Sequence, residues 1–129
     1  MRRMVRSSLA LFWVASALLS GCANPAFMDP IEGRTFIVEE RTRQDVWDAA
    51  IAVLEAEGRV EAEDYQLGEV RGYAGERLEY SAVLISLNQL YPGEDVYTVS
   101  VAAEAVAPLG DDEQVREALI GMMREKLAL

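Results

Sequence analysis

Few residues of this chain have the side chains that most enzymes use for catalysis. The 129 residues include no histidine, the commonest general base and the commonest metal ligand. Cys22 is the only cysteine, so no disulfide can form within the chain. The serines and threonines lack a histidine to activate them, and the only lysine, Lys126, lies near the C-terminus. We therefore predict that the chain is not an enzyme.

Carboxylates are the remaining candidates for acid–base chemistry or metal binding. Acidic residues gather at three turns: Glu61, Glu63, Asp64 and Glu69; Glu94 and Asp95; Asp111, Asp112 and Glu113. A glycosidase needs two carboxylates across a cleft, and one of them needs a raised pKa. Short turns in a domain of this size leave little room for a cleft, and no Asp-x-Asp-x-Asp-Gly calcium loop is present. We interpret these acids as solvated turns and helix caps, and expect no metal or cofactor. A hydrolase with paired carboxylates is the least favoured alternative.

The N-terminal residues have the three parts of a secretory signal peptide. Arg2, Arg3 and Arg6 precede a mostly apolar run over residues 9–19, which ends in small residues before Cys22. That run is shorter than the roughly 20 apolar residues that a membrane-spanning helix requires. We therefore predict a cleaved leader over residues 1–21.

The end of this leader, Leu19-Ser20-Gly21-Cys22, resembles a bacterial lipobox. The resemblance implies cleavage before Cys22, a diacylglyceryl group on its thiol, and an acyl group such as palmitate on its amine. Ala23 resembles an outer-membrane sorting signal, since enterobacterial lipoproteins kept in the inner membrane tend to carry Asp there. The expected location is the outer membrane, facing the periplasm. A secreted protein with a free cysteine and an uncleaved anchor are the alternatives.

Charge limits the partners of the mature chain. Without the leader's three arginines, nine basic and 22 acidic residues remain, for a net charge of −13. Nucleic-acid binding is not expected, because it depends on phosphate neutralisation by Lys and Arg. Anionic headgroups would repel this surface, so the membrane is expected to hold the chain only through lipid at Cys22. The acidity aids solubility, reflects a salt-loving host, or serves a cationic partner.

The rest of the sequence predicts one domain over residues 34–129, after a lipidated cysteine and short tether over residues 22–33. Alternating patterns predict strands at 59–64, 69–74 and 95–106. β-Branched and aromatic residues predict another at 35–40, and a longer run that is apolar on both sides predicts one at 78–87. Capping-box spacings at Thr42 and Asp111 predict two amphipathic helices, the first of which ends at Gly58 as a C′ residue. Gly121 is expected to allow the second helix to pack closely. We predict an α+β two-layer sandwich with an antiparallel sheet of four to five strands and both helices on one face.

The predicted sheet has one face away from the helices. We expect it to be partly polar, with Glu61, Arg71, Glu79, Ser81, Thr98 and Ser100. Val83, Ile85 and Leu87 are expected to form an apolar patch on this outer face. With Tyr91 they are the predicted partner surface, unless the loop over residues 88–94 covers the patch. Tyr73 and Tyr91 are the tyrosines best placed to stack on a ligand.

The domain resembles small bacterial lipoproteins with a β-α-β…β-α domain of unknown function. The likeness rests on Val46-Trp47-Asp48-Ala49, on Glu57-Gly58 and on Gly110-Asp111-Asp112, and covers about residues 35–128. It implies an architecture and no catalytic residues. A looser likeness, in architecture alone, is to lipoprotein subunits of outer-membrane assembly machines.

These features favour a non-enzymatic envelope lipoprotein that acts as an interaction or accessory module, with a protein of the envelope as its partner. The alternative is a small-ligand or lipid-binding protein. In that case, small residues such as Ala82, Ala102 and Ala103 would leave space between the helices and the sheet.

Overall fold

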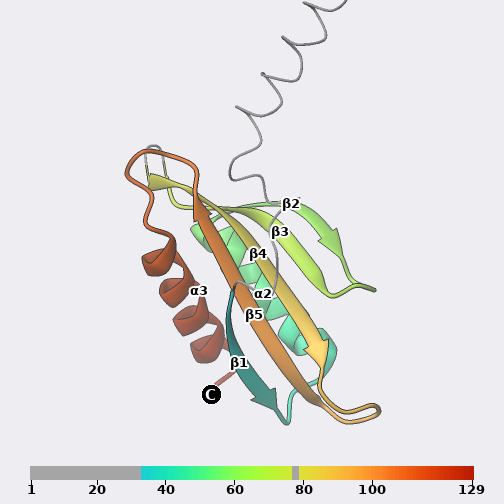
Figure 1. Cartoon of the computed structure of the whole chain (residues 1–129). Coiled ribbons are helices and arrows are strands. Elements are labelled where there is room, and N and C mark those ends of the chain that lie inside the picture. The colour runs from blue at the N-terminus through green and yellow to red at the C-terminus, as the bar shows by residue number, and fades with distance from the viewer. Residues whose placement is uncertain (1–32, 77–78) are drawn as a thin grey trace, which may run out of the picture.

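A five-stranded antiparallel sheet forms one layer of the protein, and two helices form the other (Figure 1). The computed structural model describes residues 33–76 and 79–129. The spatial order of the strands is β1-β5-β4-β3-β2. This architecture confirms the predicted α+β fold. The elements are β1 (Arg34–Glu39), α2 (Arg43–Glu57), β2 (Gly58–Asp64), β3 (Glu69–Ala74), β4 (Ser81–Gln89), β5 (Val96–Ala105) and α3 (Asp112–Lys126).

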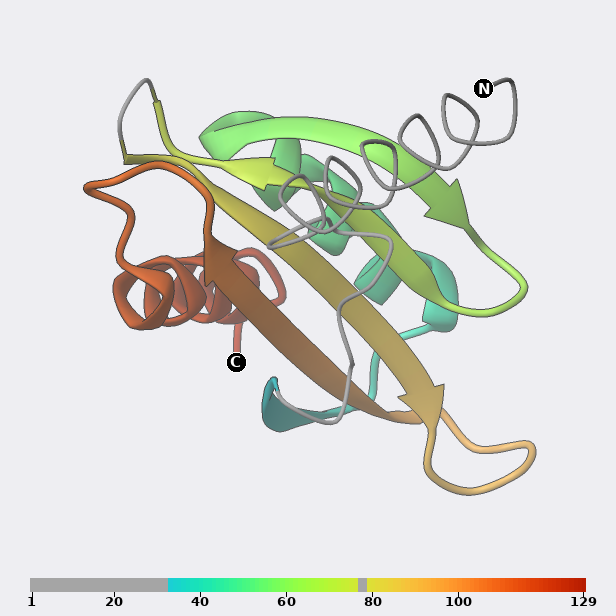
Figure 2. The same ribbon diagram turned by 45° about the horizontal axis from the view of Figure 1, so that its top comes forward.

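Both helices cover the same face of the sheet, and they pack against each other there (Figures 1 and 2). α2 lies over β2, β3 and β4, and α3 lies over β5. One hydrophobic core fills the space between the layers. Its fully buried side chains come from both layers and include Leu54, Leu119, Met123, Val99 and Val101. We call the opposite side of the sheet the helix-free face.

The start of α2 has the predicted capping box. The Thr42 hydroxyl accepts a hydrogen bond from the Asp45 N–H at 3.1 Å, and the Thr42 N–H donates to the Asp45 carboxylate at 3.3 Å. The first helix ends at Gly58 as predicted, but the predicted reason, a C′ residue, is wrong. Gly58 has φ −176°, which is extended backbone, and it leads directly into β2. A Cβ there would lie 1.9 Å from the Tyr73 carbonyl oxygen, so close approach of β3 is what requires glycine.

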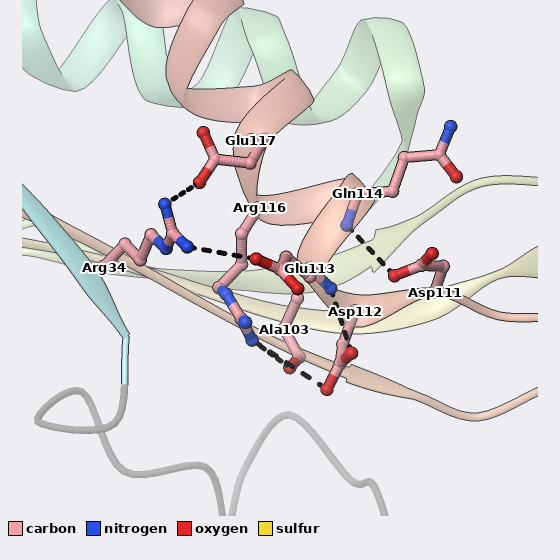
Figure 3. Close-up of polar contacts among 8 residues, drawn as sticks. All are labelled: Arg34, Ala103, Asp111, Asp112, Glu113, Gln114, Arg116 and Glu117. Atoms are coloured by element: carbon pink, nitrogen blue, oxygen red, sulfur yellow. Dashed lines mark hydrogen bonds and ion pairs between the residues drawn. The ribbon is translucent and has the colours of Figure 1, made fainter.

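The start of α3 is tied to the edge of the sheet (Figure 3). The Asp111 carboxylate accepts from the Gln114 N–H at 3.1 Å, as its spacing predicts. Arg34, the first residue of β1, forms ion pairs with Glu113 and Glu117 on α3. The prediction for Gly121 is wrong. Its position is exposed, and a Cβ there would have no heavy atom within 4 Å outside its own neighbourhood.

The predicted outer patch of Val83, Ile85 and Leu87 belongs to the core. All three are at most 3% exposed and face the helices. β4 is a central strand with apolar residues on both faces, so its own pattern does not distinguish the two sides. The register with β5 distinguishes them, because Val83, Ile85 and Leu87 pair with the core residues Ala103, Val101 and Val99.

Ser81, predicted on the polar outer face, also lies on the helix side. It pairs with the core residue Ala74 and is fully buried. Arg71, Thr98 and Ser100 do lie on the helix-free face, between core-facing neighbours. The sheet ends at β2, an edge strand that pairs only with β3 and is mostly exposed.

Candidate functional site

Exposed apolar side chains gather at one end of the sheet. Tyr91, the one exposed member of the predicted partner surface, is 54% exposed in the β4–β5 turn, next to the exposed Leu90. The β2–β3 turn lies at the same end and exposes Leu67 (61%) and Tyr65. The two turns are connected through β4, where the Leu87 N–H donates to the Gly68 carbonyl at 2.7 Å. We call Tyr65, Leu67, Leu90 and Tyr91 the turn-end surface.

The β2–β3 half of this surface is held firmly. The ring of Tyr65 meets the edge of Trp47 on α2, with centroids 5.2 Å apart and planes at 89°. The Arg43 guanidinium lies 4.2 Å from the Tyr65 ring centroid and also donates to the Tyr65 carbonyl. Asp64 closes the turn by accepting from the Leu67 N–H at 3.0 Å. These contacts hold the Tyr65 ring and the backbone of the turn in place before any partner binds, which lowers the entropic cost of binding.

A buried tyrosine supports the other half of the turn-end surface. The Tyr97 hydroxyl donates to the Asp95 carboxylate at 3.1 Å, and only 4% of the side chain is exposed. Burial raises the pKa of Tyr97 above its usual value, and the hydrogen bond to Asp95 and its negative charge raise it further. Tyr97 therefore stays protonated as the donor that holds the base of the β4–β5 turn.

Most of the acidic side chains at the turns have structural partners. Glu61 pairs with Arg59 at 2.7 Å, and Glu69 pairs with Arg71 at 2.8 Å. Asp112 accepts from the Glu113 N–H at 2.9 Å, in addition to the cap at Asp111 and the ion pairs of Arg34 (Figure 3). Within residues 33–76 and 79–129, no group of three or more acidic or cysteine side chains is arranged to hold a metal ion.

A cavity of about 600 Å³ opens at the opposite end of the sheet, where α2 gives way to β2. Its walls include Tyr73 and Tyr80, whose rings meet edge to face at 5.8 Å, and Arg59, which lies 4.8 Å from the Tyr73 centroid. Glu57 and Glu76 also line it. Tyr73, predicted as a stacking residue, is half-buried here and already contacts a cation.

The small residues predicted to leave space for a ligand do not lie on the same face of the sheet. Ala82 and Ala102 lie on the helix-free face, while Ala103 is in the core. They therefore do not line a common space between the helices and the sheet.

The predicted processing and sorting residues lie outside the described part of the chain. They are Leu19, Ser20, Gly21, Cys22 and Ala23. Within the described part, none of the helices has the length and apolar character needed to cross a bilayer.

The sequence alone does not predict that the four residues of the turn-end surface lie at one end of the sheet. Tyr91 belongs to the predicted partner surface, but Tyr65 and Leu67 do not, because the contact between Tyr65 and Trp47 joins positions far apart in the chain. The signal for this surface in the sequence is that each of two otherwise polar turns carries two large apolar or aromatic residues. Comparison of the chain with protein-family models and with curated proteins finds no match.

Proposed function

We propose that this chain is a lipid-anchored protein of the cell envelope, held in the outer membrane and facing the periplasm, where it acts as a non-enzymatic interaction module. The anchor would be the acylated Cys22, which the lipobox-like residues Leu19-Ser20-Gly21-Cys22 support. The observation that carries the interaction role is the turn-end surface. It presents four exposed apolar side chains on turns that are already ordered.

The expected partner is another envelope protein. Exposed apolar groups grouped at one end of a small domain are typical of protein contact sites. Anionic lipid is a poor partner for this end, because Asp64, Glu94 and Asp95 lie in or beside the same two turns. A partner with an apolar centre and a basic rim would fit both features.

The anchor is tested by the intact mass of the protein from separated membrane fractions, beside a Cys22→Ala control. We expect a mass that begins at Cys22 and includes acyl groups, in the outer-membrane fraction, and loss of that fraction in the control. An unmodified thiol, or a retained segment over residues 1–21, would overturn the anchor.

The interaction role is tested by placing a photo-crosslinking amino acid at Tyr91, at Leu67 and at the exposed control position Glu104 in cells. We expect both turn-end positions to yield an adduct of the same mass and Glu104 to yield none. The absence of an adduct at both turn-end positions, or an equal yield at Glu104, would overturn this role.

The cavity beside Tyr73 and Tyr80 supports a second candidate function, the binding of a small ligand. Its volume is within the range of small-molecule sites, and two aromatic rings and a guanidinium converge on it. Native mass spectrometry of the protein as isolated would show a co-purifying ligand, and Tyr73→Ala should release it. A bare protein mass would count against this function.

A further inference from the structure

The strand β1 lies at one edge of the sheet and has a neighbour on one side only. Among the described residues it pairs with β5 alone, in an unbroken register along all of Arg34–Glu39 (Figure 1). Every second residue of such a strand directs its N–H and C=O groups away from the sheet. The outer side of β1 therefore offers a regular row of hydrogen-bonding groups to a further strand.

An apolar side chain is exposed at the centre of this edge. Ile37 is 55% exposed on the helix-free face, where it pairs with Thr98 of β5. Its neighbours on the same face of β1, Thr35 and Glu39, are exposed as well. Of the large apolar side chains that are exposed in the described part of the chain, Ile37 alone lies within a strand. The edge thus combines free backbone groups with exposed apolar surface.

We propose that β1 pairs with β1 of a second copy of this chain, antiparallel about a two-fold axis at Ile37. Two-fold pairing uses the same surface on both copies, so no other component is needed. Opposed residues of an antiparallel pair lie on the same face of the sheet. Ile37 then packs against its own copy on the helix-free face, and the two five-stranded sheets form one continuous sheet.

The other opposed positions in this register are compatible. Phe36 comes opposite Val38, and both face the hydrophobic core of their own copy. Thr35 comes opposite Glu39. Arg34, which is already ion-paired with α3, comes opposite Glu40. No two like charges therefore face each other across the paired strands, where they would be destabilising.

The charge of this edge is balanced. Residues 34–41 contain two arginines and two glutamates, although the mature chain is predicted to have a net charge of −13. Charges elsewhere on the two copies are largely screened beyond about 8 Å at physiological ionic strength. The other edge strand, β2, carries three carboxylates and one arginine over Gly58–Asp64. Of the two edges, β1 is therefore the one suited to an identical partner.

A strand of a different protein is the alternative occupant. It would need a matching order of apolar and charged residues, whereas a second copy supplies this order by symmetry. The inference concerns a different surface from the turn-end surface, and it does not require lipid at Cys22.

Disulfide crosslinking of the full chain tests the proposal. Every variant carries Cys22→Ala, so that an introduced cysteine is the only thiol. Ile37→Cys places two thiols opposite each other at the two-fold axis, and Glu104→Cys is the control at an exposed position of β5 on the same face. We expect position 37 to crosslink about tenfold faster than position 104, because pairing raises the effective concentration of its thiols. Equal rates at the two positions would overturn the proposal.

Two further positions on β1 test the register. In the proposed dimer the two copies of Thr35 are about 14 Å apart along the strands, too far for a disulfide. Thr35→Cys alone should therefore crosslink no faster than Glu104→Cys. A mixture of Thr35→Cys and Glu39→Cys chains should form a disulfide between unlike chains, which mass spectrometry identifies. Crosslinking of Thr35→Cys alone at the rate of Ile37→Cys would contradict the proposed pairing.

Sedimentation of the parent chain in detergent is a test that needs no substitution, and we expect a mass of two chains. Ile37→Lys should weaken the dimer about tenfold or more, because it opposes two cations at the axis. Leu109→Lys changes the net charge equally at an exposed position outside the sheet, and it should leave the dimer intact. A monomeric parent chain, or equal dimers of the two lysine variants, would overturn the proposal even if the cysteine variants failed to fold.

Discussion

At the scale of single residues, Gly121 shows how a position can be tolerated without being required. It lies on the exposed side of α3, and a Cβ there would contact nothing beyond its own neighbourhood. Glycine inside a helix costs about 1 kcal/mol relative to alanine, because the unfolded chain has more conformational freedom to lose.

Gly121→Ala should therefore stabilise the domain by about 0.5–1 kcal/mol. For a domain of this size the thermal midpoint should rise by roughly 2–8 °C, as measured by circular dichroism. Gly58→Ala is the contrasting variant, because a Cβ there would lie 1.9 Å from the Tyr73 carbonyl oxygen. Gly58→Ala should lower the free energy of unfolding. Similar effects at the two positions would contradict the packing described for them.

Tyr97 predicts a dependence of stability on alkaline pH. Its raised pKa means that the folded chain holds the phenolic proton more tightly than the unfolded chain does. This contribution is fully present below the unfolded pKa of about 10, and it is lost as pH rises from there through the higher folded pKa.

Tyr97→Phe should remove that contribution. At neutral pH the variant should be less stable by about 0.5–1.5 kcal/mol, because the hydrogen bond to Asp95 is lost. The difference from the parent should shrink as pH rises from about 10 through the higher folded pKa, as followed by urea unfolding. A difference that stays constant over this range would show that Tyr97 titrates alike in both states.

At the scale of elements, β4 separates residues that hold the fold from a turn that we propose contacts a partner. Ile85 is fully buried between the sheet and the helices, while Tyr91 lies in the turn after β4 and is largely exposed. The strand therefore belongs to the core, and the turn that follows it belongs to the exposed surface.

Ile85→Ala should destabilise the domain by about 2–5 kcal/mol, since it leaves a cavity in the core. Tyr91→Ala should change stability by no more than about 0.5 kcal/mol, as expected of an exposed position. Chemical denaturation of both variants measures these values. If Ile85→Ala were nearly neutral while Tyr91→Ala was strongly destabilising, the assignment of core and surface would be wrong.

The element boundaries followed from local signals. The strand at 69–74 was predicted with its observed limits, and the capping box of Thr42 and Asp45 was confirmed, because alternation and caps act within a few residues. The face of β4 was predicted wrongly, since both of its sides are apolar and only pairing with β5 distinguishes them. Gly58 was also misjudged, because its need for glycine comes from the Tyr73 carbonyl of a different strand.

At the scale of the whole molecule, the predicted two-layer fold is confirmed, while the candidate site was found only in part. Tyr91 was chosen correctly as an exposed residue, and Val83, Ile85 and Leu87 were not. The contacts that assemble the turn-end surface join α2 to the β2–β3 turn. Such contacts form only in the folded chain, so the spacing of residues along the sequence does not predict them.

The edge strand β2 has one further consequence. An unpaired strand edge is a template on which another chain can add itself, and β2 leaves such an edge open. Yet β2 carries Glu61, Glu63 and Asp64, and its pairing with β3 shifts register between Val60 and Ala62. Two domains meeting edge to edge would bring these carboxylates together. Copies crowded side by side are thus kept from growing into a shared, aggregating sheet.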